Sequence, residues 1–141
     1  MISTRGRYSL RVMADLAVNQ GDGYIPMKEV AARQGISLKY LEQILPVLSR
    51  NKLVKAAHGK GGGYRLTRDS HDYKIGEILR LTEGTLSSVA CLAEDAPKCE
   101  RAHTCITLEL WKGLNKVICE YLDSWTLADL LVEENKEKTQ K

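Results

Sequence analysis

The sequence contains no phenylalanine, only three prolines and only four cysteines among 141 residues. A hydrophobic core must therefore be built from leucine, isoleucine, valine, tyrosine and the two tryptophans. The first residues lack the apolar segment of a signal peptide, and no stretch is long and apolar enough to span a membrane. We therefore expect a cytoplasmic protein without a membrane partner, and structural disulfides are not expected in that reducing compartment.

Charge is divided unevenly along the chain. Residues 1–70 hold 12 Lys and Arg against 5 Asp and Glu, a net charge of +7. Residues 71–141 hold 9 against 13, a net charge of −4. A basic half joined to an acidic half is expected when one half binds a polyanion such as DNA. A solvated charged surface without that function would give the same numbers.

The motifs of common enzymes are also missing. There is no phosphate-binding loop, no dinucleotide fingerprint and no arrangement of Ser, His and Asp typical of nucleophilic catalysis. The three histidines, His58, His71 and His103, are far from one another and from any evident nucleophile. We predict that the protein is not an enzyme.

The first third of the chain predicts a helix-turn-helix. Apolar residues recur at helical spacing in segments 7–20, 27–34 and 38–50. Gly35 would end the second helix in a left-handed cap, and the Ser37 hydroxyl would cap the third. The first helix is expected to face the core with Leu10, Met13, Ala14, Ala17 and Val18. The third helix is expected to face solvent with Lys39, Tyr40, Gln43 and Arg50.

A glycine-rich hairpin is predicted directly after these helices. Residues 53–58 and 64–67 have the composition of two strands, and residues 59–63 are glycines interrupted by Lys60. Glycines allow the backbone to approach a phosphate closely, and Lys60 and Arg65 add positive charge. An ordinary flexible hairpin would look similar, but its place after a helix-turn-helix in a basic half favours the wing of a winged helix.

The remaining residues predict a short helix at 74–82, a polar loop at 84–104 and a long helix at 105–123. The long helix has a wide apolar stripe, which consists of Leu110, Trp111, Leu114, Val117, Ile118, Tyr121 and Leu122. We interpret it as a dimerisation helix; the alternative is that it packs on its own domain. Thr126 is expected to cap a last helix, with Asp129 completing a capping box.

The predicted fold is thus mostly α with a small β-hairpin wing. A winged helix-turn-helix DNA-binding domain takes residues 1–82, with the helix-turn-helix at about 27–50 and the wing at 53–67. A cysteine-bearing loop follows at 83–105. Residues 105–135 form the dimerisation helix and a C-terminal helix, and residues 136–141 form a tail.

Three of the four cysteines fall in the polar loop. Cys91, Cys99 and Cys105 have the spacing C-x7-C-x5-C, and three thiolates suit an iron–sulfur cluster or zinc. Three incidental thiols are the alternative. Cys119 lies 14 residues beyond Cys105, about 21 Å along a helix, and is interpreted as a packing residue. A fourth ligand is left open among His103, Glu94, Asp95, Glu100 and Glu109.

The chain resembles a known family over almost its whole length, to about residue 132. The resemblance rests on residues 3–8 (STRGRY), 34–43 (QGISLKYLEQ) and 61–64 (GGGY), and on Leu53-Val54 and the cysteine triad followed by Leu110-Trp111. These segments resemble the Rrf-type winged-helix transcription regulators, the IscR/NsrR/RirA/CymR-like family. Within it, the chain is most similar to the regulators of iron–sulfur cluster assembly.

The resemblance implies a homodimer that binds double-stranded DNA at an inverted-repeat operator, as a repressor or an activator. It implies an iron–sulfur cluster on Cys91, Cys99 and Cys105, with [2Fe–2S] favoured over [4Fe–4S], whose status tunes DNA binding. At two positions where relatives supply a fourth ligand, this chain has Leu108 and Tyr8. The resemblance places ten residues at the DNA, namely Arg5, Arg7, Ser37, Lys39, Tyr40, Glu42, Gln43, His58, Lys60 and Gly61. We add Arg50, which is expected to face solvent on the third helix.

Two alternatives to the cluster sensor remain open. The first is a regulator of the same family without a cluster, which serves sulfur or cysteine metabolism and is controlled by thiol oxidation or a protein partner. The second is a DNA-binding module with a structural zinc. Iron, sulfide and zinc contents separate the three.

Overall fold

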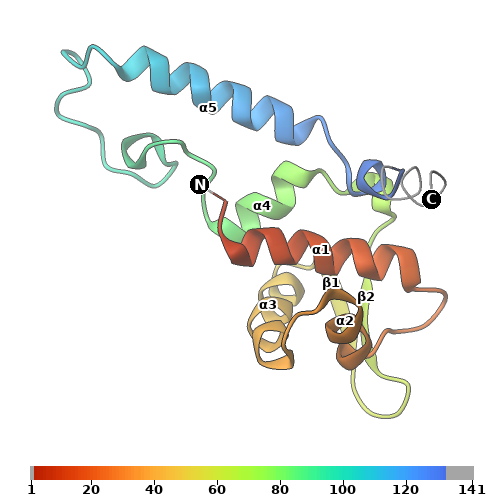
Figure 1. Cartoon of the computed structure of the whole chain (residues 1–141). Helices are drawn as coiled ribbons and strands as arrows, with labels where there is room; N and C mark the ends of the chain where they lie inside the picture. The colour runs from red at the N-terminus through yellow and green to blue at the C-terminus, as the bar shows by residue number, and fades with distance from the viewer. Residues whose placement is uncertain (1, 133–141) are drawn as a thin grey trace.

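The computed structural model describes residues 2–132. Helices make up most of it, with one two-stranded antiparallel sheet (Figure 1). The elements in chain order are α1 (Thr4–Asn19), α2 (Met27–Gln34), α3 (Leu38–Arg50), β1 (Val54–Ala57), β2 (Gly63–Leu66), η1 (Ser70–Asp72), α4 (Ile75–Glu83), η2 (Ala90–Leu92) and α5 (Leu108–Asp123). No helix of the described residues is long and apolar enough to cross a membrane.

Helix α1 differs from the prediction in its start and in its buried face. It begins at Thr4 because the Ser3 side chain accepts a hydrogen bond from the Gly6 amide and caps the helix. Val18, expected in the core, is 47% exposed. The buried residues of α1 are Gly6, Ser9, Val12, Met13, Asp15 and Leu16.

The helix-turn-helix agrees with the prediction at both ends of its turn. Gly35 has φ 63° and ends α2 in the left-handed conformation. The Ser37 hydroxyl accepts a hydrogen bond from the Tyr40 amide at 3.1 Å and caps α3. Helix α3 continues through Pro46, and it packs into the core with Leu41, Ile44, Leu45 and Leu48.

The second strand of the hairpin is joined to the segment before α2. Strands β1 and β2 pair with Val54 opposite Leu66 and Ala57 opposite Gly63. Ile25 exchanges two backbone hydrogen bonds with Tyr64, at 2.9 and 2.8 Å. The hairpin is therefore held to the segment before α2 by main-chain bonds at Tyr64, near the tip end of β2. The tip loop itself extends away from the helices (Figure 1).

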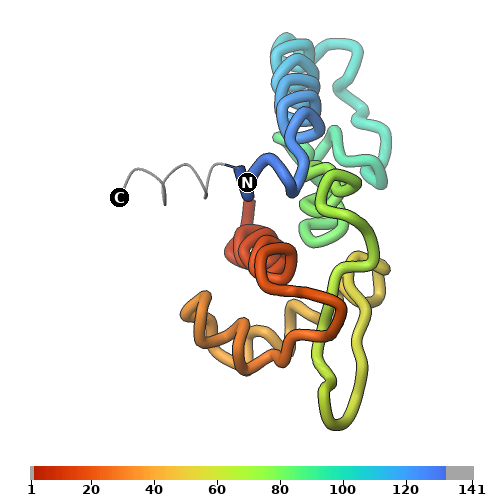
Figure 2. The backbone as a smooth tube through the Cα atoms, turned by 90° about the vertical axis from the view of Figure 1, so that its right-hand side faces the viewer, coloured from red at the N-terminus to blue at the C-terminus, as the bar shows by residue number. Residues whose placement is uncertain are grey.

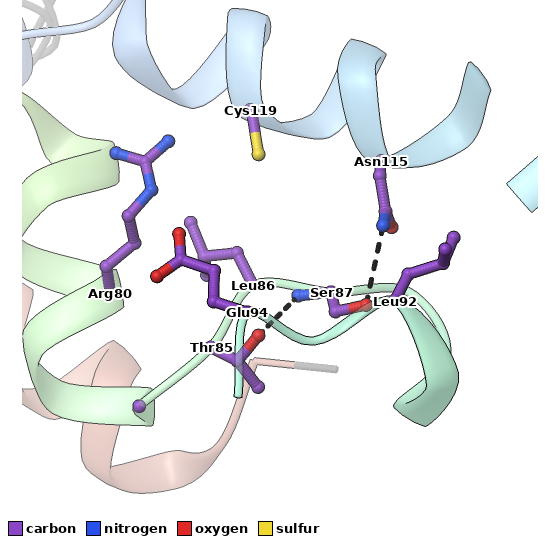
Figure 3. Close-up of a pocket in the computed structure, with 9 residues that line it drawn as sticks. Arg80, Thr85, Leu86, Ser87, Leu92, Glu94, Asn115 and Cys119 are labelled. Carbon is purple, nitrogen blue, oxygen red and sulfur yellow. Dashed lines mark hydrogen bonds between the residues drawn. The ribbon is translucent and has the colours of Figure 1, made fainter. Parts of the chain in front are cut away.

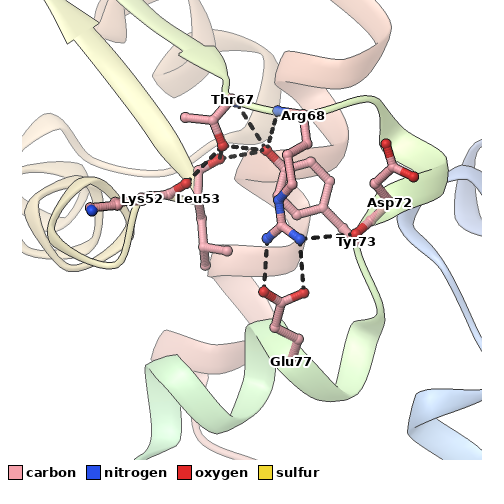
Figure 4. A network of polar contacts seen from close by, with 7 residues as sticks. All are labelled: Lys52, Leu53, Thr67, Arg68, Asp72, Tyr73 and Glu77. Atoms are coloured by element: carbon pink, nitrogen blue, oxygen red, sulfur yellow. Dashed lines mark hydrogen bonds and ion pairs between the residues drawn. The ribbon is translucent and has the colours of Figure 1, made fainter.

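A buried tyrosine hydroxyl fixes the segment that leaves the hairpin (Figure 4). The Tyr73 hydroxyl donates to the Leu53 carbonyl at 2.7 Å and accepts from the amides of Thr67 and Arg68, each at 3.0 Å. Arg68 covers the Tyr73 ring at 4.3 Å and pairs with Glu77 at 2.8 Å. These bonds connect both strands of the hairpin to α4.

Helix α5 begins at Leu108, three residues later than predicted, so Cys105 belongs to the preceding loop. It lies beyond α4 on the side away from the hairpin, and the loop after α4 reaches its far end (Figures 1 and 2). The capping box is confirmed, with Thr126 N donating to Asp129 at 2.8 Å and Asp129 N to Thr126 at 3.2 Å. Residues 127–132 are helical; the predicted stretch 133–135 and the tail 136–141 lie outside the described residues.

Candidate DNA-binding surface and cysteine loop

The first turns of α3 present polar side chains to solvent. Ser37, Lys39, Glu42 and Gln43 are exposed. The buried residues of the same helix are Leu41, Ile44, Leu45 and Leu48. A helix-turn-helix uses this part of its second helix to reach base edges in the major groove. The structure therefore places these four predicted residues on one accessible surface.

Tyr40 is half-buried, unlike its neighbours in the same turn. Its ring meets the Tyr8 ring edge-on, with centroids 5.5 Å apart and planes at 80°. Arg11 lies over the other ring, 5.0 Å from the Tyr8 centroid, and donates to the Gln34 carbonyl. Tyr40 thus attaches the start of α3 to α1.

A buried carboxylate ties α1 to the helix-turn-helix. The Asp15 side chain is 1% exposed and accepts two hydrogen bonds from Arg33, at 2.9 and 2.8 Å. It accepts a third from Gln34 at 2.9 Å. The bonds to Asp15 raise the pKa of the Arg33 guanidinium. Because a buried carboxylate is stable only when paired, this pair specifies how α1 sits on α2.

Further basic residues border this surface. Arg5 and Arg7 are exposed in the first turn of α1, and Arg50 is exposed at the end of α3. His58, Lys60 and Gly61 are exposed at the tip of the hairpin. Within residues 2–132, the cationic side chains among these make no salt bridge, so their charge is available to an anionic partner.

The structure adds Arg11 and Lys55, which the sequence did not identify, to this surface, and it shows where the predicted Arg65 lies. Arg11 lies at the turn between α2 and α3; its position four residues after Arg7 on one helix could have indicated it. Lys55 and Arg65 stand directly opposite each other in the hairpin. Arg65 also donates to the Asp22 carbonyl at 2.7 Å. Two cations at facing positions place positive charge on one side of the hairpin.

The cysteine loop joins α4 to α5. Cys91, Cys99 and Cys105 are all exposed, and so are the candidate fourth ligands His103, Glu94, Asp95, Glu100 and Glu109. Among residues 2–132, no three His, Cys, Asp or Glu side chains come together closely enough to hold a metal ion. The loop thus carries the three thiols on one segment without gathering them. Cys119 is half-buried on α5, apart from them.

Cys105 lies just before the first turn of α5. Its thiol is 3.4 Å from the Thr107 hydroxyl. That hydrogen bond, together with those of the Thr107 and Leu108 amides, lowers the pKa of the Cys105 thiol. Leu108 is half-buried at the start of the helix and has no atom that could bind a metal.

The base of the cysteine loop is attached to α5 (Figure 3). Ser88 N donates to Asn115 Oδ1 at 2.6 Å, and Asn115 Nδ2 donates to Ser87 Oγ at 3.4 Å. A pocket lies between this base and α5. Its lining includes Arg80 of α4, Glu94 of the loop, and Asn115 and Cys119 of α5. The loop therefore connects to both helices that flank it.

Helix α5 leaves an apolar stripe uncovered. Leu110, Leu114, Val117 and Tyr121 follow one another at helical spacing and are 63%, 41%, 62% and 60% exposed. The stripe continues into a groove whose lining includes Ile118 of α5 and Leu86 of the loop. An apolar surface of this kind usually marks a contact with another molecule.

The helix-turn-helix, the hairpin beside it and the exposed polar turn of α3 define a winged-helix protein. The chain belongs to the Rrf2 family, described as iron-dependent transcriptional regulators, whose pattern it matches over residues 2–133. It is therefore a DNA-binding transcription regulator of that family.

Individual relatives agree with this assignment. The HTH-type transcriptional regulator IscR of Sodalis glossinidius (strain morsitans) is 36% identical over 133 residues, which are 94% of this chain and 79% of that protein. The structure of T. potens IscR is 37% identical with a TM-score of 0.75, and the match covers 100% of this chain and 91% of that one. The structure of CymR, the global cysteine regulator of B. subtilis, is 38% identical with a TM-score of 0.74 and 92% and 95% coverage.

Proposed function

We propose that this chain is a homodimeric transcription regulator whose binding to an inverted-repeat operator responds to an iron–sulfur cluster on Cys91, Cys99 and Cys105. The genes controlled would be those of iron–sulfur cluster assembly or related iron and redox functions. The observation that carries the proposal is the position of three exposed thiols on the one loop that joins the DNA-binding domain to α5. A change in the conformation of that loop would therefore affect both the DNA-binding domain and α5.

The DNA-binding role is divided between two kinds of contact. Ser37, Lys39, Glu42 and Gln43 are exposed on α3 and would read base edges in the major groove. Glu42 can accept from a cytosine amine but is repelled by phosphate. Tyr40, half-buried against Tyr8, would orient this turn. The contacts proposed for the DNA backbone are Arg5, Arg7, Arg50, His58, Lys60 and Gly61.

The dimer is proposed from the exposed stripe of α5. A second copy of the chain would cover Leu110, Leu114, Val117 and Tyr121 in a symmetric contact. Such a dimer presents two α3 helices to one face of DNA. When these are about 34 Å apart, one helical turn, the operator is an inverted repeat.

The donor set fits an iron–sulfur cluster in its chemistry. Three exposed thiols on one loop supply soft thiolate ligands, and the [2Fe–2S] form is the one we propose. The fourth ligand would come from His103, a carboxylate of the loop, a small thiol or the partner chain. A bound cluster would supply iron–sulfur bonds that join distant positions of the loop. Because Ser87 and Ser88 are hydrogen-bonded to Asn115, a change in the conformation of the loop base would move α5.

The test is a metal analysis of protein purified without oxygen. Near-stoichiometric iron and sulfide that are lost in Cys99→Ala and retained in Cys119→Ala would support the cluster site. The Cys119 variant is the matched control because this thiol is half-buried on α5, outside the loop. Operator affinity that is equal with and without the cluster would reject sensing while leaving DNA binding intact.

A cluster-free regulator is the second candidate. It is favoured by the similarity to CymR of B. subtilis and by the separation of the thiols within residues 2–132. In that case iron and sulfide are missing even after reconstitution, and oxidation of the thiols or a protein partner changes DNA affinity instead. Zinc found in place of iron would identify a structural zinc module.

A further inference from the structure

The last residue of α4 contacts the first turn of α1. Glu83 Oε1 accepts two hydrogen bonds from Ser3, one from its amide at 2.9 Å and one from its hydroxyl at 2.7 Å. The Ser3 hydroxyl oxygen in turn accepts from the Gly6 amide at 3.2 Å. A carboxylate at the N-terminus of a helix also interacts favourably with the helix dipole. Glu83 therefore caps α1 from another helix, 80 residues away in sequence.

Gly6 makes room for this carboxylate. A Cβ atom built on Gly6 would overlap Glu83 Oε1 and lie 3.3 Å from Leu79 Cδ2. Glycine is a poorer helix former than alanine, so its presence inside α1 has a local cost. A side chain at this position would displace the Glu83 carboxylate from its contact with Ser3.

The two arginines proposed to contact the DNA backbone lie inside this clamped turn. Arg5 and Arg7 are both exposed and flank Gly6 in sequence. The next residue, Tyr8, packs against Tyr40 of α3. The turn is therefore fixed on one side by α4 and on the other by α3.

We propose that Glu83 is a positioning residue that orients Arg5 and Arg7 for contact with DNA phosphates. The inference rests on the proposed function, because it assumes that these two arginines contact DNA. A carboxylate near DNA repels phosphate, so a simple charge effect predicts tighter binding when Glu83 is removed. Positioning predicts the opposite, and the sign of the change separates the two.

The experiment measures binding of the full chain to a mixed-sequence DNA duplex over a series of salt concentrations. Binding to such a duplex depends mainly on phosphate contacts. Arg5→Gln combined with Arg7→Gln should weaken binding and reduce the slope of log affinity against log salt by about 1.8, at roughly 0.9 per contact. Glu83→Ala should weaken binding by up to the same factor and reduce the slope with it.

Three further variants make the test specific. Glu83→Gln keeps an acceptor oxygen for Ser3 and should bind DNA as the wild type does, whereas a loss of negative charge alone predicts tighter binding. Gly6→Ala should reproduce Glu83→Ala, because its Cβ displaces the carboxylate. Glu83→Ala should weaken binding no further when Arg5 and Arg7 are already glutamine. The control is Glu120→Ala, which removes an exposed carboxylate of α5.

The outcomes distinguish a failure of the role of Glu83 from a failure of the proposed DNA contacts of Arg5 and Arg7. Unchanged or tighter binding in Glu83→Ala, with weaker binding in the double arginine variant, overturns the role of Glu83 and leaves the arginine contacts in place. Unchanged binding in the double arginine variant overturns both. If Glu83→Ala does not fold, Gly6→Ala and Glu83→Gln decide the question, because the first must weaken binding while the second preserves it.

Discussion

The Arg80 guanidinium donates hydrogen bonds to both carboxylate oxygens of Asp123, at 2.9 and 2.8 Å, and so joins α4 to the end of α5. Backbone bonds extend this junction. Ile75 N donates to the Trp125 carbonyl and Leu127 N to the Tyr73 carbonyl, each at 2.9 Å. Helix α5 is therefore attached to the rest of the chain at its C-terminal end by this pair and near its middle by the bonds of Asn115 to the base of the cysteine loop.

We expect Asp123→Asn to change how stability depends on pH. The bond to Arg80 lowers the pKa of Asp123 in the folded protein below its unfolded value of about 3.9. The stabilisation is therefore present above that unfolded value and is lost as pH falls through the folded pKa. Both side chains are about one-third exposed (35% and 34%), so the pair contributes less than about 1 kcal/mol. Urea unfolding at neutral pH and at a pH below the folded pKa of Asp123 should show the variant destabilised only at neutral pH.

Removal of the Tyr73 hydroxyl should destabilise the fold by about 1–3 kcal/mol, because the Arg68 amide loses its acceptor and the Thr67 amide keeps only the Leu53 carbonyl at 3.5 Å. Tyr73→Phe leaves the ring and its packing unchanged. The measurement is the midpoint of urea unfolding. The control is Tyr24→Phe, which removes a hydroxyl from a half-buried ring near Arg65. Equal stability of the Tyr73 variant and wild type would show that the network in Figure 4 does not support the hairpin.

The boundaries of α2 and α3 could be predicted from sequence because they depend on local chemistry. Gly35 takes the left-handed conformation and Ser37 caps the next helix, and both preferences belong to the residue itself. The buried face of α1 could not be predicted in the same way. It includes Asp15, which is buried only because Arg33 and Gln34, from another helix, bind it. Hydrophobic periodicity does not register a buried ion pair of this kind.

The conformation of the cysteine loop, like the buried face of α1, could not be predicted from sequence. Spacing identified Cys91, Cys99 and Cys105 as candidate ligands, but spacing does not determine whether a loop gathers them, and within residues 2–132 it does not. Cys105 was expected at the boundary between the loop and the long helix, whereas α5 starts only at Leu108. Its place in the loop depends on where α5 starts, which local composition did not reveal.

Lys60→Gln should weaken DNA binding with little dependence on base sequence. The side chain is exposed at the hairpin tip, where the backbone of Gly59 and Gly61 has positive φ, 83° and 78°. Loss of one phosphate contact should reduce the slope of log affinity against log salt by about 0.9. Lys28→Gln, on the exposed side of α2, is the control for a general loss of charge. The same slope change in both variants would mean that the hairpin tip makes no particular contact.

The stripe on α5 offers the most direct test of the dimer. Val117 is 62% exposed in the single chain and lies between Leu114 and Tyr121 on the stripe. Val117→Glu would place a charge in the middle of an apolar contact, where it has no partner and is costly to desolvate. Sedimentation at increasing protein concentration should then find a dimer for wild type and a monomer for the variant.

The matched control is Lys112→Gln, which changes net charge by the same amount on the opposite side of the helix, since five residues at 100° each separate the two positions. It should remain a dimer. The monomer should also lose most of its preference for an inverted repeat, because one chain reads only one half-site, while its binding to mixed-sequence DNA falls less. A Val117→Glu variant that stays dimeric would show that the dimer interface lies elsewhere. A wild-type protein that is monomeric at all concentrations would show that the stripe binds another protein and not a second copy of this chain.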